Sequence, residues 1–177
     1  YPGSAVKNPG SRDLREDLCA LIRAAKPEVI ISHNLAYKHD THVALALRTI
    51  EALRSLAPKA RPRKLYGGEV WRSLDWMPDD AKVSWDVSKR ENIQSSLLGV
   101  FDSQISGGKR YDLAAAARRQ AAATYSQARE VDKATALSMA MDLTPLLRDT
   151  EIDPMDYIGG LIEQFRGEVF TRADRFS

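Results

Sequence analysis

The chain has 177 residues, of which 44% are hydrophobic and 28% are charged. This length fits one domain, and this balance of residue types is ordinary for a globular protein and excludes a disordered or fibrous class. The formal net charge is only +2, which predicts no strong attraction to nucleic acid or to an anionic membrane. No membrane span and no secretory segment is visible, so we expect a cytoplasmic protein.

The first third of the chain is typical of helix, strand and helix. Residues 13–25 carry apolar side chains at helical spacing, with Ser11 or Asp13 as the cap and Pro27 as the stop. The only cysteine, Cys19, lies on the apolar face of this helix, so we expect it in the core. Residues 28–32 form a β-branched run of the kind that is buried on both faces of a parallel sheet. Apolar residues from Val43 to Leu53 then predict a second helix, and this order favours an α/β, Rossmann-like doubly wound sheet.

The middle of the chain predicts two more strands, at 64–72 and 82–87, preceded by a basic run at 59–64 that we interpret as a solvated linker. Between the strands, Met77-Pro78-Asp79-Asp80 is typical of a turn, because proline fixes φ and aspartate bonds local backbone. Ser88 is expected to cap a helix that runs to Gln104. The apolar side chains that this helix would present to the core are Ile93, Leu97, Leu98 and Phe101.

The last third of the chain is expected to be mainly helical. Two glycines in the segment 107–112 indicate either a sharp turn between helices or a loop that approaches a ligand, where Arg110 could hold an anionic or hydroxyl-rich group. Residues 112–125 predict a helix rich in alanine and arginine. The segment 142–145 is expected to end a further helical stretch, and Pro154 to begin the final helix.

Three histidines, His33, His39 and His42, fall within ten residues of one another at the predicted carboxyl end of the strand 28–32. Open α/β sheets bind ligands at this end of their strands. His39 and His42 are three residues apart, so their imidazoles can meet on one helical face, and imidazole suits zinc and its neighbours in the transition series. The pair therefore predicts half of a metal-hydrolase site, although surface or packing histidines can show the same spacing.

Around these histidines the sequence resembles the PIG-L or LmbE-like family of zinc-dependent N-acyl deacetylases. Residues 26–34 resemble the strand and loop of that family, and Tyr37 to His42 resembles its H-x-x-H motif. Residues 66–76 and 101–104 resemble further family segments, so the likeness covers most of residues 13 to 150. The resemblance implies that His42 is a Zn²⁺ ligand, that His39 is the catalytic histidine, and that Tyr37 places a hydroxyl near the oxyanion.

Two departures from the family pattern stand beside this resemblance. The other zinc ligands of the family, and its general-base aspartate, come from an H-P-D-D-E-like motif that precedes the strand, and no such motif precedes His39 here. We therefore expect residues 1–177 to be one domain that corresponds to the carboxyl-terminal two-thirds of a family domain, without its amino-terminal strands. In addition, Thr41 stands before the second histidine, where many relatives carry an aspartate, and the acid has moved to Asp40.

A second cluster, at residues 69–76, combines the residue types that sugar sites use. Glu69, Trp71 and Arg72, with Asp75 and Trp76, could stack on a pyranose ring and bond its hydroxyls. The two tryptophans could equally be core aromatics at the end of a strand. Glu69, Trp71, Arg72 and Arg110 are thus candidate substrate-binding residues.

The resemblance implies zinc-dependent hydrolysis of an N-acetyl amide on an amino-sugar-like small molecule, which releases acetate and a free amine. One alternative is a catalytically incomplete pseudoenzyme or interaction domain, because two of the three expected zinc ligands are missing. A second is an HD-type metal phosphohydrolase built on His39-Asp40, a helical fold against which the predicted strand argues. We expect the chain alone to be inactive, and either to pair with an amino-terminal segment or to self-associate.

Overall fold

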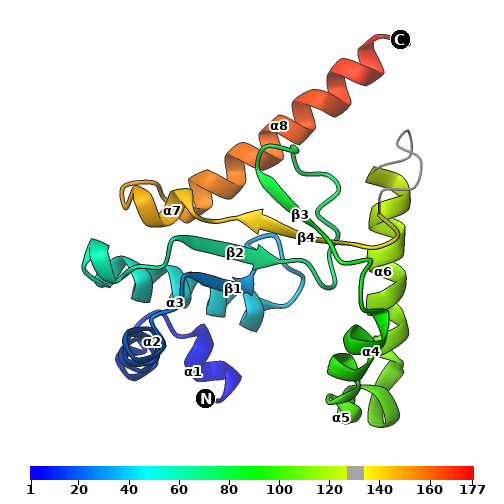
Figure 1. Cartoon of the computed structure of the whole chain (residues 1–177). Coiled ribbons are helices and arrows are strands. Elements are labelled where there is room, and N and C mark those ends of the chain that lie inside the picture. The colour runs from blue at the N-terminus through cyan, green and yellow to red at the C-terminus, as the bar shows by residue number, and fades with distance from the viewer. Residues whose placement is uncertain (127–133) are drawn as a thin grey trace. The chain divides into compact units, whose positions relative to one another are not determined.

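The computed structural model describes residues 1–126 and 134–177, which form an α/β fold with a four-stranded sheet (Figure 1). The helices are α1 (Gly3–Lys7), α2 (Arg12–Ala25), α3 (Asp40–Ser55), α4 (Glu91–Gly99), α5 (Asp102–Gln104), α6 (Tyr111–Ser126), α7 (Pro145–Arg148) and α8 (Pro154–Asp174). The strands are β1 (Val29–His33), β2 (Lys64–Gly68), β3 (Lys82–Asp86) and β4 (Leu137–Asp142). A 3₁₀ turn at Pro58–Ala60 and a π-type turn at Ile105–Lys109 complete the described elements.

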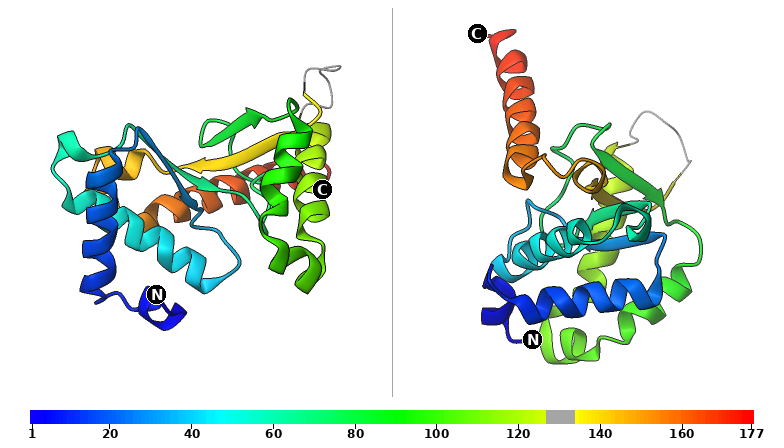
Figure 2. Two further views of the ribbon diagram at one scale, coloured as in Figure 1. Left: turned by 60° about the horizontal axis from the view of Figure 1, so that its bottom comes forward. Right: turned by 90° about the vertical axis from the view of Figure 1, so that its left-hand side faces the viewer.

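The sheet is mixed, with the strand order β1-β2-β4-β3. Strands β1 and β2 run parallel, from Val29 opposite Lys64 to His33 opposite Gly68. Helix α3 connects these two strands and packs against β1 (Figure 2). Strand β4 is antiparallel to β2, with Tyr66 opposite Asp142. The carboxyl ends of β1 and β2 therefore lie side by side at one edge of the sheet.

The chain divides into two compact units. Unit 1 contains Tyr1–Val83 and Ala140–Ser177, and unit 2 contains Ser84–Met139, so that unit 2 is inserted into unit 1 along strands β3 and β4. The core of unit 1 is built by α3, β2, β4 and the segments around α7. Its largest fully buried apolar side chains are Ile50, Leu53, Leu65, Leu74, Met141, Leu143 and Leu146.

Several sequence predictions are confirmed. Helices α2 and α6 match the ranges 13–25 and 112–125 closely, and α8 begins at Pro154, with the Asp153 side chain accepting hydrogen bonds from the first turn. Cys19 is buried, and its thiol lies 3.5 Å from the carbonyl oxygen of Ala52. A turn follows Met77, where the Ala81 backbone N–H donates to the Pro78 carbonyl over 3.2 Å. Within the described residues, no helix is long and apolar enough to cross a membrane.

Four predictions about local structure are wrong. Strand β1 is not buried on both faces, because Val29 and Ile31 are 46% and 64% exposed. The predicted helix 88–104 breaks after Gly99, and its supposed core residues Ile93, Leu97 and Phe101 are exposed. Residues 137–142 form strand β4 and not the end of a helix.

The fourth error concerns Arg61 in the basic run at residues 59–64: Lys59 and Arg63 are exposed, as a solvated linker requires, but Arg61 is not. The Arg61 guanidinium donates to the carbonyl oxygens of Leu56, Leu147 and Arg54, over 3.1, 2.9 and 2.8 Å. These carbonyls lie at or just beyond the ends of α3 and α7, where backbone acceptors have no partner within their own helix. Arg61 is therefore a structural residue that connects two helix ends.

Candidate functional site

The predicted catalytic residues lie between the end of β1 and the first turn of α3. His33 is the last residue of β1, His39 is the N-cap residue of α3, and His42 lies in the first turn of that helix. The backbone N–H of His42 donates to the His39 carbonyl over 3.0 Å, which holds both residues in one turn. The structure thus places all three histidines at the carboxyl end of a strand, as the sequence predicts.

The rings of these residues form one cluster. His33 and His42 stack face to face, with ring centroids 4.0 Å apart and planes that differ by 4°. Tyr37 meets this pair from the side, with its centroid 4.7 Å from that of His42 and 5.2 Å from that of His33. His39 is more exposed and meets the His42 ring edge-on at 5.4 Å.

Asn34 anchors the loop that carries these rings. Its side chain is fully buried, and its amide nitrogen donates to the carbonyl oxygen of Gly68 over 2.8 Å. The backbone of Asn34 lies so close to β2 that a Cβ atom on Gly67 would stand 2.6 Å from the Asn34 Cα. Glycine at 67 therefore allows the two strand ends to approach each other, which sets the position of His33 and of the loop after it.

Burial favours the neutral forms of His33, His42 and Tyr37. Burial lowers the pKa of His33, and the neighbouring His42 lowers it further. Burial likewise lowers the pKa of His42, to which the charge of His39 adds. Burial raises the pKa of Tyr37, and a hydrogen bond from the Trp71 backbone offsets part of this effect. These shifts favour the uncharged imidazole of His33 and of His42 and the protonated phenol of Tyr37.

The predicted sugar-binding cluster at residues 69–76 separates into two parts. The Trp71 indole is 37% exposed and lies edge-on to His39, with centroids 6.5 Å apart, so it borders the histidine cluster. Trp76 packs instead against Phe165 of α8, with centroids 6.0 Å apart. The Glu69 carboxylate accepts a hydrogen bond from the Leu74 backbone N–H over 2.9 Å and so shapes the turn, while Arg72 is exposed.

Arg110, the remaining candidate, belongs to unit 2 and follows the π-type turn. Its guanidinium pairs with Asp112 over 2.7 Å, and this contact raises the pKa of Arg110 and lowers that of Asp112. Its backbone has a positive φ of 40°, which the turn into α6 requires. Of the two interpretations of residues 107–112, this geometry agrees with a turn between helices that has an exposed basic side chain at its tip.

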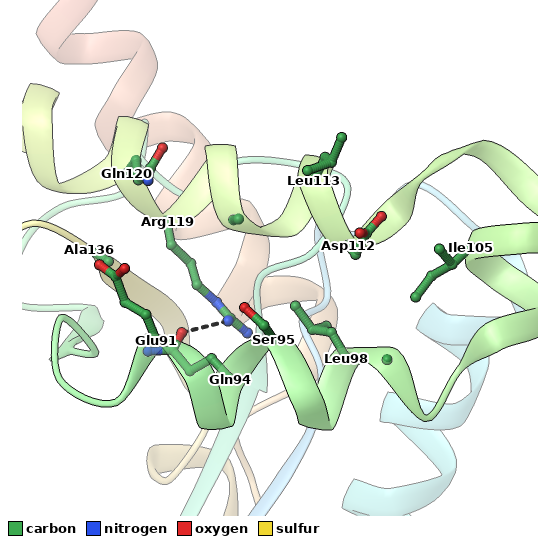
Figure 3. Close-up of a pocket in the computed structure, with 12 residues that line it drawn as sticks. Glu91, Gln94, Ser95, Leu98, Ile105, Asp112, Leu113, Arg119, Gln120 and Ala136 are labelled. Carbon is green, nitrogen blue, oxygen red and sulfur yellow. Dashed lines mark hydrogen bonds between the residues drawn. The ribbon is translucent and has the colours of Figure 1, made fainter.

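Unit 2 has a cavity of its own, of about 190 Å³, between α4 and α6 (Figure 3). The Arg119 side chain reaches from α6 toward α4, where its guanidinium donates to the Gln94 side-chain oxygen over 2.8 Å. Leu98 and Leu113 contribute apolar walls. The described residues that line it include no histidine or cysteine, so they offer neither an imidazole nor a thiol.

The donor set of the histidine cluster fits one position of a zinc site. His42 Nδ1 is buried and has no hydrogen-bond partner among the described residues, which is the state of an imidazole nitrogen that is free to bind a metal. Residues 1–126 and 134–177 contain no group of three or more histidine, cysteine or carboxylate side chains that could hold a metal ion. A catalytic zinc site has three protein ligands, so these residues do not complete one by themselves.

Sequence reasoning gave no role to three residues that shape this site: His33, Asn34 and Gly67. Part of the information was present, because parallel strands that end in Ser-His-Asn and Tyr-Gly-Gly bring those segments together at one edge of the sheet. The stacking of His33 on His42 depends on side-chain angles that the sequence pattern does not specify.

No family model matches this chain, and no curated protein matches it. Among solved structures, the chain is similar to GalB, the 4-carboxy-2-hydroxymuconate hydratase from Pseudomonas putida, with 18% sequence identity and a TM-score of 0.54. The match covers 75% of this chain and 58% of the hydratase. At this identity the likeness concerns the fold alone, and the chain spans little more than half of the length of that enzyme.

Proposed function

We propose that this chain is part of a cytoplasmic, zinc-dependent hydrolase that removes an N-acetyl group from an amino-sugar-like substrate. The observation that carries the proposal is the unpartnered, buried Nδ1 of His42, which lies at the carboxyl ends of two parallel strands beside Tyr37 and His39. Ligand sites of open α/β sheets lie at this edge. The resemblance to PIG-L or LmbE-like deacetylases supplies the reaction class.

The proposal extends to the sheet. We infer that β1 and β2 belong to a Rossmann-like doubly wound sheet whose preceding strands would pair with β1. Two observations support this inference: β1 is at one end of the strand order, and Val29 and Ile31 of β1 are exposed. The same upstream segment would supply the two further zinc ligands and the carboxylate base.

Each residue of the cluster has a distinct chemical task in this proposal. His42 would hold the zinc ion as one imidazole ligand, and the bound ion would supply Lewis-acid polarisation of the substrate carbonyl. His39 is exposed at the N-cap of α3 and donates a proton to the departing amine, which cannot leave as an anion. Tyr37 stays protonated, because burial raises its pKa, and its hydroxyl donates a hydrogen bond to the developing oxyanion.

Substrate binding is assigned to the residues that border this cluster. Trp71 presents an exposed indole beside His39, which is suited to stack on a sugar ring. Glu69 fixes the turn after Trp71, and Arg72 is exposed within the same turn. Arg110 belongs to unit 2 and does not border the cluster; it is assigned on the sequence pattern alone, as a guanidinium after paired glycines that could hold an anionic or hydroxyl-rich group.

The experiment that tests the proposal replaces each histidine by alanine in a polypeptide that includes the upstream segment. His42→Ala should lose zinc, as measured by metal analysis. His39→Ala should keep zinc and lose about a hundredfold or more in turnover of an N-acetylglucosamine-like amide, as expected for a missing general acid. Equal zinc loss in both variants would contradict the separate roles. If the protein instead turned over 4-carboxy-2-hydroxymuconate and not the amide, its reaction would be a hydration and not an amide hydrolysis.

A second candidate function is that of a catalytically incomplete interaction domain. It is favoured by the finding that the described residues contain no group of three metal-binding side chains. Titration of zinc into the chain with and without its upstream segment separates the two candidates. Tight binding only with that segment supports the hydrolase, whereas weak binding in both cases supports the interaction domain. The HD-type phosphohydrolase is disfavoured, because β1 leads directly into the histidine cluster of an α/β fold.

A further inference from the structure

The ring of His33 has a geometry that none of the tasks above uses. It lies flat on the His42 ring, with centroids 4.0 Å apart and an interplanar angle of 4°. We propose that His33 is a positioning residue, which fixes the plane of the His42 imidazole through the stack and takes no part in metal binding itself. The inference rests on the proposed function in one respect, because it takes His42 to be the metal ligand.

The first step of the argument concerns how a ligating imidazole is usually oriented. In most metal sites the second ring nitrogen donates to a carboxylate, a carbonyl oxygen or a water molecule, and this hydrogen bond fixes the ring. Among the described residues neither nitrogen of the His42 ring is held in this way: Nδ1, the candidate metal-binding atom, is buried without a hydrogen-bond partner, and Nε2 has no hydrogen bond to another described residue. Its orientation must therefore come from packing.

The contacts around His42 supply that packing. His33 covers one face of the ring, and Tyr37 meets the ring at an angle of 61°, with centroids 4.7 Å apart. A ring that is held against a flat neighbour and an angled one cannot rotate about its Cβ–Cγ bond without losing both contacts. Tyr37 is itself 7% exposed, so this second contact is part of the core.

The position of His33 is fixed by the backbone and not by its own ring. His33 is paired with Gly68 in the parallel ladder, and the next residue, Asn34, donates a hydrogen bond to the Gly68 carbonyl over 2.8 Å. The ladder pairing of His33 and the hydrogen bond of the next residue together fix the backbone of His33. The His33 ring can serve as a fixed surface for the side chain that α3 brings against it.

The stacked geometry also argues against His33 as a second ligand. The lone pairs of an imidazole lie in the plane of its ring, and two ligands of one zinc ion must aim their lone pairs at a common point about 2.0–2.1 Å away. Rings that are parallel within 4° at 4.0 Å have lone pairs in separate, parallel planes. The ring face of His33 is therefore the functional part, and its nitrogens are dispensable.

The test compares His33→Phe, which keeps a flat ring, with His33→Ala, which removes it. Histidine-labelled chain is studied by NMR well above the ordinary imidazole pKa of about 6.5, so that the stacked rings of His33 and His42 are neutral. In the native chain and in His33→Phe, the His42 ring protons should show the upfield displacement of a stacked ring and cross-peaks to Tyr37. His33→Ala should lose both features. Lys38→Ala, a substitution at an exposed position of the same loop, is the matched control.

Two outcomes would overturn the proposal. If His33→Ala leaves the His42 displacement and its cross-peaks to Tyr37 unchanged, the stack does not orient the ring. If His33→Phe behaves as His33→Ala does, a nitrogen of His33 is needed. Should His33→Ala fail to fold, His33→Leu, which is bulky but not planar, takes its place.

A second measurement connects the stack to metal binding. In the polypeptide with its upstream segment, His33→Ala should weaken zinc affinity by about 10–100-fold, which is typical for the loss of a group that orients a ligand, and His33→Phe should restore most of it. The NMR result requires neither zinc nor substrate. A failure of the proposed hydrolase activity therefore leaves the stacking result intact, and a failure of the stack leaves the activity assay to be judged by itself.

Discussion

Unit 1 and unit 2 are stabilised in different ways. The large side chains with almost no exposure, such as Ile50, Leu65 and Met141, all belong to unit 1. The described residues of unit 2 bury only four apolar side chains, Ala123, Ala136, Leu137 and Met139, and several apolar side chains on α4 and after it are exposed.

Hydrogen bonds from polar side chains carry much of the organisation of unit 2. The Gln94 side chain donates to the Val87 carbonyl, and the Ser88 hydroxyl accepts from the Thr135 backbone N–H over 2.8 Å. Apolar burial contributes more to stability than such bonds do. The unit that carries the histidine cluster is therefore the one with the stronger core.

The largest expected effect comes from a pair of leucines, one in each unit. Leu53 is completely buried in α3, so Leu53→Ala should lower the free energy of unfolding by about 2–5 kcal/mol. Leu97 is 63% exposed in α4, and Leu97→Ala should change the free energy of unfolding by less than about 0.5 kcal/mol. Urea unfolding monitored by circular dichroism measures both values. Losses of similar size would show that unit 2 depends on its apolar side chains as strongly as unit 1 does.

Two glycines should respond with opposite signs. Gly67→Ala would place a Cβ 2.6 Å from the Asn34 Cα, and we expect a loss of about 1–3 kcal/mol as the strand ends are forced apart. Gly99 in α4 has nothing within 4 Å of its Cβ position, so Gly99→Ala should stabilise unit 2 by up to about 1 kcal/mol through its helix propensity. Thermal unfolding of the two variants provides the measurement. A neutral Gly67→Ala variant would mean that the approach of β1 to β2 is not tight.

Tyr157 should make the stability of unit 1 depend on pH in the alkaline range. Its hydroxyl donates to the Asp142 carbonyl over 2.6 Å, and burial, with Asp142 and Asp80 nearby, raises its pKa to about 12. Because the folded pKa is raised, this contribution is fully present below the ordinary tyrosine pKa of about 10 and is lost as pH rises toward 12.

We therefore expect Tyr157→Phe to cost about 1 kcal/mol near pH 7, discounted for the partial exposure of the side chain. The difference between wild type and variant should narrow as pH rises from about 10 to 12, since the wild-type phenol ionises in both states at the upper end. Urea midpoints at several alkaline pH values measure this difference. A constant difference over that range would show that the phenol does not titrate with unfolding.

A substitution on the edge strand β1 of unit 1 should have the smallest effect on stability. It should nevertheless change the self-association of the chain. Ile31 is 64% exposed on the edge strand β1, so Ile31→Lys should change stability by less than about 0.5 kcal/mol while it reduces self-association of the chain. Phe101→Lys replaces a side chain of the same exposure, 64%, in unit 2 and serves as the matched variant. Light scattering over a range of concentrations compares the two. If Phe101→Lys alone reduces association, the contact is made by unit 2 and not by the strand edge.

The parts of the fold that the sequence predicts well have strong local patterns. Helices α2 and α8 combine apolar spacing with a stop at Pro27 or a start at Pro154, and both agree with the structure. Strand β4 was missed because Leu-Ser-Met-Ala-Met-Asp contains no β-branched residue, so its pairing with β2 decides its conformation.

The helix predicted at 88–104 shows a different limit of sequence patterns. Apolar spacing indicates which face of a helix is apolar, but it does not show that another element covers that face. The same holds for the site. The order of residues places His39 and His42 in one helical turn, whereas the stack with His33 requires the end of β1 to meet the start of α3 in space.

The arginines at the end of α3 have a consequence for the order of events during synthesis. Arg54 donates to the carbonyl oxygens of Leu146 and Ile152, and Arg61 donates to that of Leu147, so these partners are made some 90 residues later. Until that segment has left the ribosome, these three hydrogen bonds cannot form. Closing so long a loop is entropically slow. We therefore expect the nascent chain to form α2 and α3 first. The hydrogen bonds that fix the end of α3 should form only after the whole of unit 2 has emerged.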